Sequence, residues 1–122
     1  LINCAGVFPP FRKAVDFTVS DIESVMKTNF LSAVYAVKNL LPFLEKSRFP
    51  TIVNVSSAAA LASIVGTSGY SASKSALKAY TEILSEELRG KAYVGLVMPG
   101  FARTDIMRSQ NTSFDEDKLA KK

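Results

Sequence analysis

Apolar residues follow two different periods along the chain, and these periods define the predicted elements. Residues 1–6 start apolar and run into Gly6, which predicts a short strand. Continuous apolar runs at residues 51–56 and 91–98 predict two further strands, the last ending before Pro99. Residues 69–89 predict a helix that ends at Gly90. Another helix is predicted over about residues 21–46, where the apolar positions have helical spacing: Ile22, Val25, Met26, Phe30, Ala33, Val34, Val37, Leu40, Leu41 and Leu44.

The helix predicted over residues 21–46 carries a start signal and an internal proline. Ser20 and Glu23 have the spacing of a capping box, in which a hydroxyl and a carboxylate satisfy the first backbone N–H groups. Pro42 lacks a backbone N–H, so we expect it to bend or restart the helix. The remaining residues, 101–122, are polar and mixed, and we expect a loop there with a short helix near residues 103–109.

The order strand, helix, strand, helix, strand predicts an α/β fold with parallel strands and helical crossovers. Such crossovers are almost always right-handed, so strands added successively on one side would place both helices on one face of the sheet. Two predicted strands nevertheless carry apolar residues on both sides, which is typical of sheets that are covered on both faces: Ile52, Val53 and Val55 in one, and Tyr93, Val94, Leu96 and Val97 in the other. One face should therefore be bare in this chain and should need cover from further chain or another subunit.

Composition limits the class of protein. The 122 residues suffice for one domain, and an apolar content of 48% predicts a buried core. The positive charges that give a net charge of +4 are scattered, apart from Lys118, Lys121 and Lys122, so we expect no nucleic-acid partner. No apolar run is long enough to predict a membrane span. A single cysteine, Cys4, fits a reducing compartment and hence the cytoplasm, and we expect it to be a small buried residue.

The chain contains no histidine. This excludes a Ser-His-Asp hydrolase, a histidine general base and the usual zinc enzymes, and we expect no metal site. Any proton transfer must use tyrosine, lysine, a carboxyl group, the cysteine or water.

Polar residues gather where the predicted strands end. Ligands of open parallel sheets bind beyond the carboxyl ends of the strands. Residues 3–6, 54–57 and 99–104 follow the three strands, and Tyr70 and Lys74 begin the helix after the second strand. Residues four apart share a helix face, so these two side chains lie close together. The pKa of tyrosine is ordinarily about 10, and a nearby ammonium lowers it, so that the phenol can exchange a proton with a substrate oxygen. The same spacing also occurs on ordinary amphipathic surfaces, so alone it leaves both interpretations open.

Five segments together resemble one family. "YSASK" matches the YxxxK motif of the short-chain dehydrogenase/reductase family, and "VNVSS", which ends thirteen positions before Tyr70, matches its catalytic-serine strand and indicates Ser57 rather than Ser56. "LINCAG" resembles the NNAG segment, with Asn3 kept and Cys4 replacing the second asparagine. "KTNFLSAVYAVKNLLPFL" and "VMPGFARTDI" resemble the active-site asparagine helix and the PG motif with its threonine. The resemblance covers about residues 1–108 and favours the classical branch.

The resemblance implies part of a Rossmann-like, doubly wound parallel sheet and hydride transfer between nicotinamide and a ketone or secondary alcohol. It implies Tyr70 as acid/base, Lys74 as its activator and ribose ligand, Ser57 as the group that orients the substrate oxygen, and Asn29 as the anchor of a water that links Lys74 to solvent. Read from the residues alone, Asn29 could instead be a capped or solvated helix residue, and Ser56 would be structural. The implied cofactor is NAD or NADP, of which we favour NADP. The implied cofactor contacts are Asn3, Ala5, Gly6, Tyr70, Lys74, Pro99, Gly100, Ala102 and Thr104, with Asn3, Ala5 and Gly6 lying near the adenosine side or bracing the sheet.

Two parts of the family pattern are absent from this sequence. The glycine-rich TGxxxGxG loop and the last strand are missing, so we expect residues 1–122 to be the C-terminal-side part of one reductase domain, nearly inactive alone, with residues 101–122 in the substrate-loop region. Alternatively, the chain is a non-catalytic interaction module, or it derives from an extended-branch epimerase or dehydratase. Family members commonly pair through their long helices, which implies a homodimer or homotetramer through helices 21–46 and 69–89.

Overall fold

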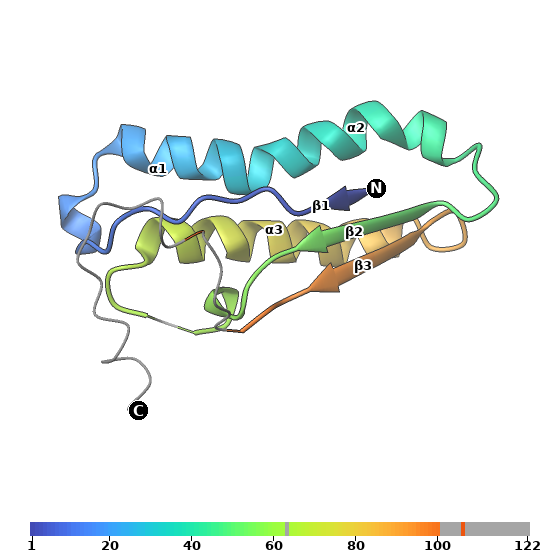
Figure 1. Cartoon of the computed structure of the whole chain (residues 1–122). Coiled ribbons are helices and arrows are strands. Elements are labelled where there is room, and N and C mark those ends of the chain that lie inside the picture. The colour runs from blue at the N-terminus through green and yellow to red at the C-terminus, as the bar shows by residue number, and fades with distance from the viewer. Residues whose placement is uncertain (63, 101–105, 107–122) are drawn as a thin grey trace.

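Three strands, β1 (Ile2–Asn3), β2 (Thr51–Val55) and β3 (Tyr93–Val97), form one parallel sheet in chain order. The computed structural model describes residues 1–62, 64–100 and 106. The helices are α1 (Val19–Met26), α2 (Ser32–Leu44) and α3 (Ser68–Glu87), with a π-helical turn at Lys27–Leu31 and 3-10 helices at Ala14–Asp16 and Ala58–Ala60. Figure 1 shows all three strands pointing toward the side of the molecule where α1 and α3 begin. The predicted α/β order is therefore confirmed.

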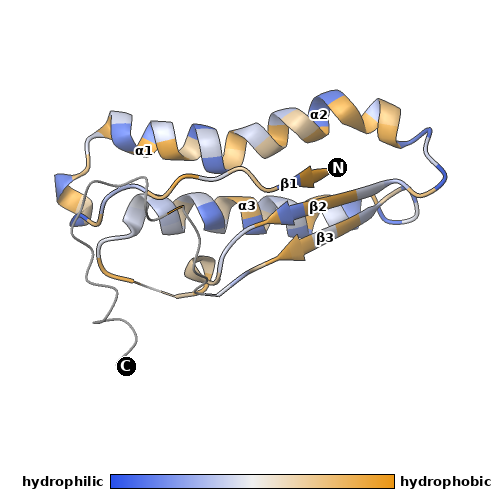
Figure 2. Cartoon of the chain, in the orientation of Figure 1, coloured by the Kyte–Doolittle hydropathy of each residue, from blue (hydrophilic) through white to orange (hydrophobic). Residues whose placement is uncertain are grey.

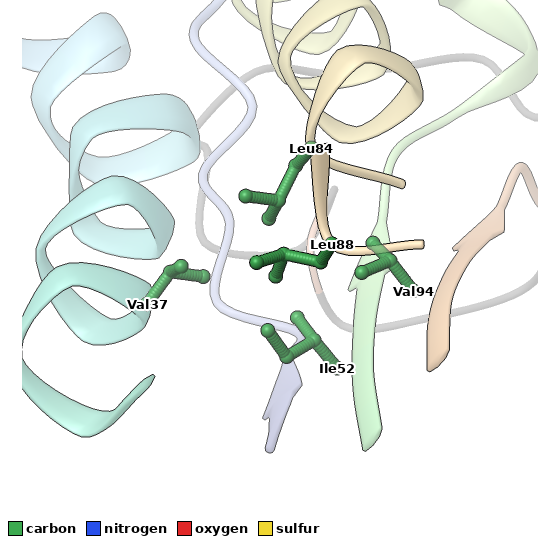
Figure 3. Packing of buried hydrophobic residues seen from close by; sticks show 5 residues of the cluster. All are labelled: Val37, Ile52, Leu84, Leu88 and Val94. Atoms are coloured by element: carbon green, nitrogen blue, oxygen red, sulfur yellow. The ribbon is translucent and has the colours of Figure 1, made fainter. Parts of the chain in front are cut away.

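Helices α2 and α3 pack against the same face of the sheet. Ile52 of β2 lies beside its register partner Val94 of β3, and both point into the core. Val37 of α2 and Leu84 of α3 meet them there, together with Leu88, which follows α3 (Figure 3). Side chains from both helices thus share one core with one face of the sheet, as the chain-order arrangement predicts.

Within the described residues, the opposite face of the sheet is bare. Ile2 is 71% exposed, and Tyr93 is 67% exposed. Val53 pairs in register with both Ile2 and Gly95, so these residues lie on one face. None of the described helices packs on this face, and the apolar pattern on both sides of the strands is therefore satisfied on one side only.

The first helix begins earlier than predicted. Thr18 accepts a hydrogen bond from the backbone N–H of Asp21 at 3.1 Å, and the Asp21 carboxylate accepts one from the N–H of Thr18 at 3.0 Å. The capping box is thus formed by Thr18 and Asp21, and the prediction of Ser20 and Glu23 is wrong. Both pairs have the required spacing in sequence, and Ser20 lies inside the first helical turn.

The interruption of the long helical segment also lies elsewhere than predicted. Helix α2 contains Pro42 and continues to Leu44, so the prediction of a restart at this proline is wrong. Pro42 is exposed, while Leu41 and Leu44 pack against the core on the inner side and hold the turn in place. The break is instead the π-helical turn, where the N–H of Ser32 donates to the carbonyl of Lys27.

The other predicted ends are close to the observed ones. Gly90 has a φ of +80°, a conformation that glycine adopts without strain, and it follows α3 as predicted. The short helix expected near residues 103–109 lies outside the described residues except for Ile106. Among the described helices, none combines the length and the apolar character that crossing a membrane requires.

Candidate active site

The loops that follow the three strands meet at one edge of the sheet. The N–H of Ala58 donates to the carbonyl of Pro99 at 2.9 Å, which ties the loop after β2 to the loop after β3. Gly6, after β1, lies so close to α3 that a Cβ placed on it would be 3.3 Å from the Nζ of Lys74. The sequence therefore predicts correctly that the strand ends and the start of α3 share one edge.

Tyr70 and Lys74 lie on successive turns of α3 and are both buried. The Nζ of Lys74 is 5.9 Å from the centre of the Tyr70 ring and donates a hydrogen bond to the carbonyl of Val55 at 3.0 Å. Burial lowers the pKa of Lys74, and an electrostatic contribution from the nearby Cys4 opposes this shift in part. The site thus holds a poorly hydrated ammonium beside a phenol. The Tyr70 ring also contacts the ring of Phe8, with 4.5 Å between centres.

The two neighbouring serines after β2 have different surroundings. The Ser56 hydroxyl is buried and donates to the backbone carbonyl of Lys74 at 2.7 Å, so it joins β2 to α3 and is structural, as expected from the residues. The Ser57 oxygen is half-buried and accepts from the N–H of Ala59 at 3.1 Å. A hydroxyl that accepts one bond still has its O–H to donate, so Ser57 can hold a further oxygen.

Asn29 lies in the π-helical turn and is 1% exposed, which rules out the solvated alternative. Its Oδ1 accepts from the N–H of Val7 at 2.7 Å, and its Nδ2 donates to the carbonyl of Val7 at 2.9 Å. The same Nδ2 donates to the Oγ of Ser73 at 3.0 Å, and this hydroxyl donates to the carbonyl of Tyr70 at 2.7 Å. Asn29 therefore connects the loop after β1 to the turn that carries the tyrosine.

Sequence reasoning missed Val7 and Ser73 as members of this network. Ser73 lies three residues after Tyr70 and is fully buried, although it belongs to a helix rich in small polar residues. That spacing allows a serine to bond back to the helix backbone, which was the available signal. Nothing in the sequence pairs it with Asn29.

Apart from Tyr70 and Lys74, the residues expected to contact a cofactor differ in their surroundings. Asn3 donates from Nδ2 to the Oδ1 of Asn54 at 2.7 Å, and Asn54 donates to the Oγ1 of Thr81 at 2.9 Å. Asn3 therefore braces β1 against β2 and α3, the second of the two roles considered for it. The group left at the site edge comprises Gly6, Ala5, Pro99 and Gly100, whereas Ala102 and Thr104 lie outside the described residues.

Cys4 differs from its prediction. The thiol is exposed, so the expectation of a small buried residue is wrong. The reason is that β1 ends at Asn3 and Cys4 already belongs to the loop, where no described element covers it. Within the described residues, no three acidic or cysteine side chains lie close enough together to hold a metal ion.

Comparison with known proteins identifies relatives of this chain. The chain is 38% identical over 111 residues to the 11-beta-hydroxysteroid dehydrogenase-like 2 of Arabidopsis thaliana, covering 90% of this chain and 35% of the relative. It is 34% identical over 116 residues to the CLA biosynthesis dehydrogenase/reductase of Lactiplantibacillus plantarum, covering 91% of this chain and 40% of the relative. The chain thus spans well under half the length of these relatives.

Solved structures share the fold as well. A protein of Shigella flexneri assigned to the short chain dehydrogenases, crystallised with NADP, superposes with a TM-score of 0.84 at 25% identity, covering 96% of this chain and 49% of that one. The family model described as short chain dehydrogenase matches residues 1–115. On this match, the chain belongs to the short-chain dehydrogenase/reductase family of oxidoreductases.

Proposed function

We propose that this chain carries the proton-transfer half of an NAD(P)-dependent oxidoreductase that interconverts a ketone and a secondary alcohol. The observation that supports this most directly is the burial of Lys74 beside Tyr70 at the strand-end edge, 5.9 Å from ammonium nitrogen to ring centre. Burying an ammonium costs free energy, so a buried ammonium next to a phenol indicates a functional role.

Four residues have separate roles in the proposed proton transfer. Tyr70 donates its phenolic proton to the substrate oxygen during reduction and takes it back during oxidation. Lys74 stabilises the phenolate by its positive charge. Ser57 donates its O–H to the same substrate oxygen and orients it. Asn29 is proposed to bind a water molecule that connects Lys74 to solvent. The two hydrogen bonds between Asn29 and Val7 hold the Asn29 side chain in one orientation.

The residues at the edge fit a nicotinamide cofactor. A Cβ at Gly6 would lie 3.3 Å from the Nζ of Lys74 and 3.6 Å from the Oδ1 of Asn29, so glycine keeps the space beside these polar atoms open. Lys74 and Tyr70 would hold the nicotinamide ribose, while Ala5 and Gly6 would border the adenosine side and Pro99, Gly100, Ala102 and Thr104 the nicotinamide side. When bound, the cofactor supplies or accepts the hydride. We favour NADP, which the Shigella flexneri structure contains.

The rest of the domain would complete the cofactor site. We propose that residues 1–122 are the C-terminal-side part of one reductase domain of a cytoplasmic protein, with a small-molecule substrate and no nucleic-acid partner, and that this part alone is weakly active or inactive. Exposed apolar side chains on the helices, including Tyr35, Phe43 and Ile83, support pairing of two copies through α1–α2 and α3.

A non-catalytic interaction module is the second candidate. The bare sheet face supports it, because Ile2 and Tyr93 present apolar surface that needs a partner. Loss of turnover on substitution of Tyr70 separates the two candidates, since an interaction module has no turnover to lose.

The test is Tyr70→Phe in the full-length protein that contains this chain. We expect turnover to fall at least about 100-fold, the usual contribution of a positioned acid/base. Cofactor affinity, measured by NADPH and NADH fluorescence, should stay within about twofold of the unsubstituted protein because the ring remains. Tyr35→Phe, on the exposed side of α2, is the matched control and should keep full turnover. Retained turnover in Tyr70→Phe would disprove the role of the phenol.

A further inference from the structure

Two loops lie side by side next to Tyr70. The N–H of Arg12 donates to the carbonyl of Gly66 at 3.1 Å, which joins the loop after β1 to the loop before α3. Gly66 has a φ of +88°, and a Cβ there would also lie 3.1 Å from the Phe11 ring, so a side chain at this position would separate the loops. The Phe8 ring lies between the Phe11 ring at 5.2 Å and the Tyr70 ring at 4.5 Å. The surface formed by both loops therefore borders the proposed acid/base.

This surface is apolar and exposed. Leu61 is 66% exposed, Ile64 is 51% exposed and Val65 is 89% exposed. Figure 2 shows part of the loop that leads into α3 in orange, the colour of hydrophobic residues. We call Phe8, Phe11, Leu61, Ile64 and Val65 the apolar rim. Single exposed apolar residues are ordinary, but several along two joined loops beside a candidate active site indicate a surface that binds an apolar ligand.

The rim contains no charged side chain. Residues 1–11 and 52–73 include no Asp, Glu, Lys or Arg. The two cations next to these segments already have partners: Arg12 pairs with Asp21 at 3.4 Å, and the Nζ of Lys74 is bonded to the carbonyl of Val55. Within the described residues, a carboxylate or phosphate on the substrate would therefore find no counter-ion among the side chains of the rim itself.

We propose that the substrate is a neutral ketone or secondary alcohol with an extended apolar body, and that this body lies on the apolar rim while its oxygen meets Tyr70 and Ser57. This inference rests on the proposed reductase function and adds the substrate class. The physical basis is that removing apolar surface from water favours binding in proportion to the area removed, up to about fourfold in affinity per fully buried methylene group.

The experiment measures kcat/KM of the full-length protein with NADPH for methyl ketones from 2-butanone to 2-octanone. Because the rim is open on one side, we expect an increase of about twofold to fourfold per methylene group. The acid 7-oxooctanoate, a methyl ketone of similar length with a carboxylate at its far end, should be at least about tenfold poorer than 2-octanone, since its charge has no partner on the rim.

Substitutions locate the effect. Leu61→Ser and Val65→Ser should each reduce kcat/KM for 2-octanone about threefold to tenfold and leave 2-butanone nearly unchanged, because only the longer ketone reaches these side chains. The matched control is Val15→Ser, which is 88% exposed in the 3-10 helix Ala14–Asp16 outside the rim, and it should change neither ketone.

The outcomes separate this inference from the proposed function. No turnover of any ketone or corresponding alcohol would overturn the proposed function itself. Turnover without dependence on chain length, or a preference for 7-oxooctanoate, would overturn only the substrate class. If Leu61→Ser and Val65→Ser instead lower the melting temperature and slow both ketones equally, the rim packs against the rest of the protein, and the inference is wrong.

Discussion

The hydrogen bonds of Asn29 allow a quantitative prediction. Asn29→Ala removes three bonds, two with the backbone of Val7 and one with Ser73, at 2.7, 2.9 and 3.0 Å. A typical hydrogen bond contributes about 1 kcal/mol net, and an orphaned buried group costs about 1–3 kcal/mol. The bonds to Val7 are only partly buried, so water can replace them in part, whereas the bond to Ser73 is fully buried. We therefore expect a loss of about 2–4 kcal/mol in the free energy of unfolding.

Urea unfolding of the chain, followed by circular dichroism, measures this loss. The matched control is Asn39→Ala, because Asn39 is exposed on α2 and makes one bond, to the carbonyl of Tyr35 at 2.7 Å. We expect this control to lose less than about 0.5 kcal/mol, as is usual for surface substitutions. If Asn29→Ala costs no more than Asn39→Ala, the network does not hold the loop after β1 to α3.

A weaker substitution covers the case in which Asn29→Ala does not fold. Ser73→Ala removes one of the three bonds of Asn29 and also the bond that the Ser73 hydroxyl donates to the carbonyl of Tyr70, and we expect it to cost about 1–2 kcal/mol. Asn29→Asp keeps the acceptor for the N–H of Val7 but loses the Nδ2 donor to the carbonyl of Val7 and to Ser73. In a double-mutant cycle of Asn29→Asp with Ser73→Ala, the two changes should be non-additive by about 1 kcal/mol. Full additivity would mean that the two side chains do not interact.

The remaining predictions concern stability. Burial lowers the pKa of Lys74 below the usual 10.5, so the free energy of unfolding should rise as pH increases toward that value. Lys74→Met should therefore gain about 1 kcal/mol of stability at pH 7 and less at pH 10, measured by urea unfolding. A loss of stability at pH 7 would show that the bond from Lys74 to β2 outweighs the cost of burial. Gly69→Val should cost about 2 kcal/mol by thermal unfolding, because a Cβ there would lie 2.9 Å from the Cδ1 of Ile22, and an unchanged melting temperature would contradict this contact. Thr18→Ala should cost about 1 kcal/mol and Ser20→Ala less than half of that in the same assay, and the reverse order would mean that the helix begins at Ser20.

The sequence by itself determined the order of the elements and the edge where the site lies. Period and turn residues act between neighbours in the chain, so they locate strands, helices and the end of α3 at Gly90 within a few residues. Parallel strands bring their carboxyl ends to one edge, and helical spacing places Tyr70 and Lys74 on one face. The bare sheet face also followed from the sequence, because Val53 and Tyr93 are apolar on the side that no described helix covers.

Only the tertiary structure decided which polar groups meet. Asn29 bonds to Val7, 22 residues away, and to Ser73, 44 residues away, and no local rule selects such partners. The choice of Thr18 over Ser20 as the cap, and the exposure of Cys4, depend on where neighbouring segments pack. Local sequence patterns limit the conformation of each segment, whereas the partners of a buried polar group depend on which distant segments the whole chain brings into contact.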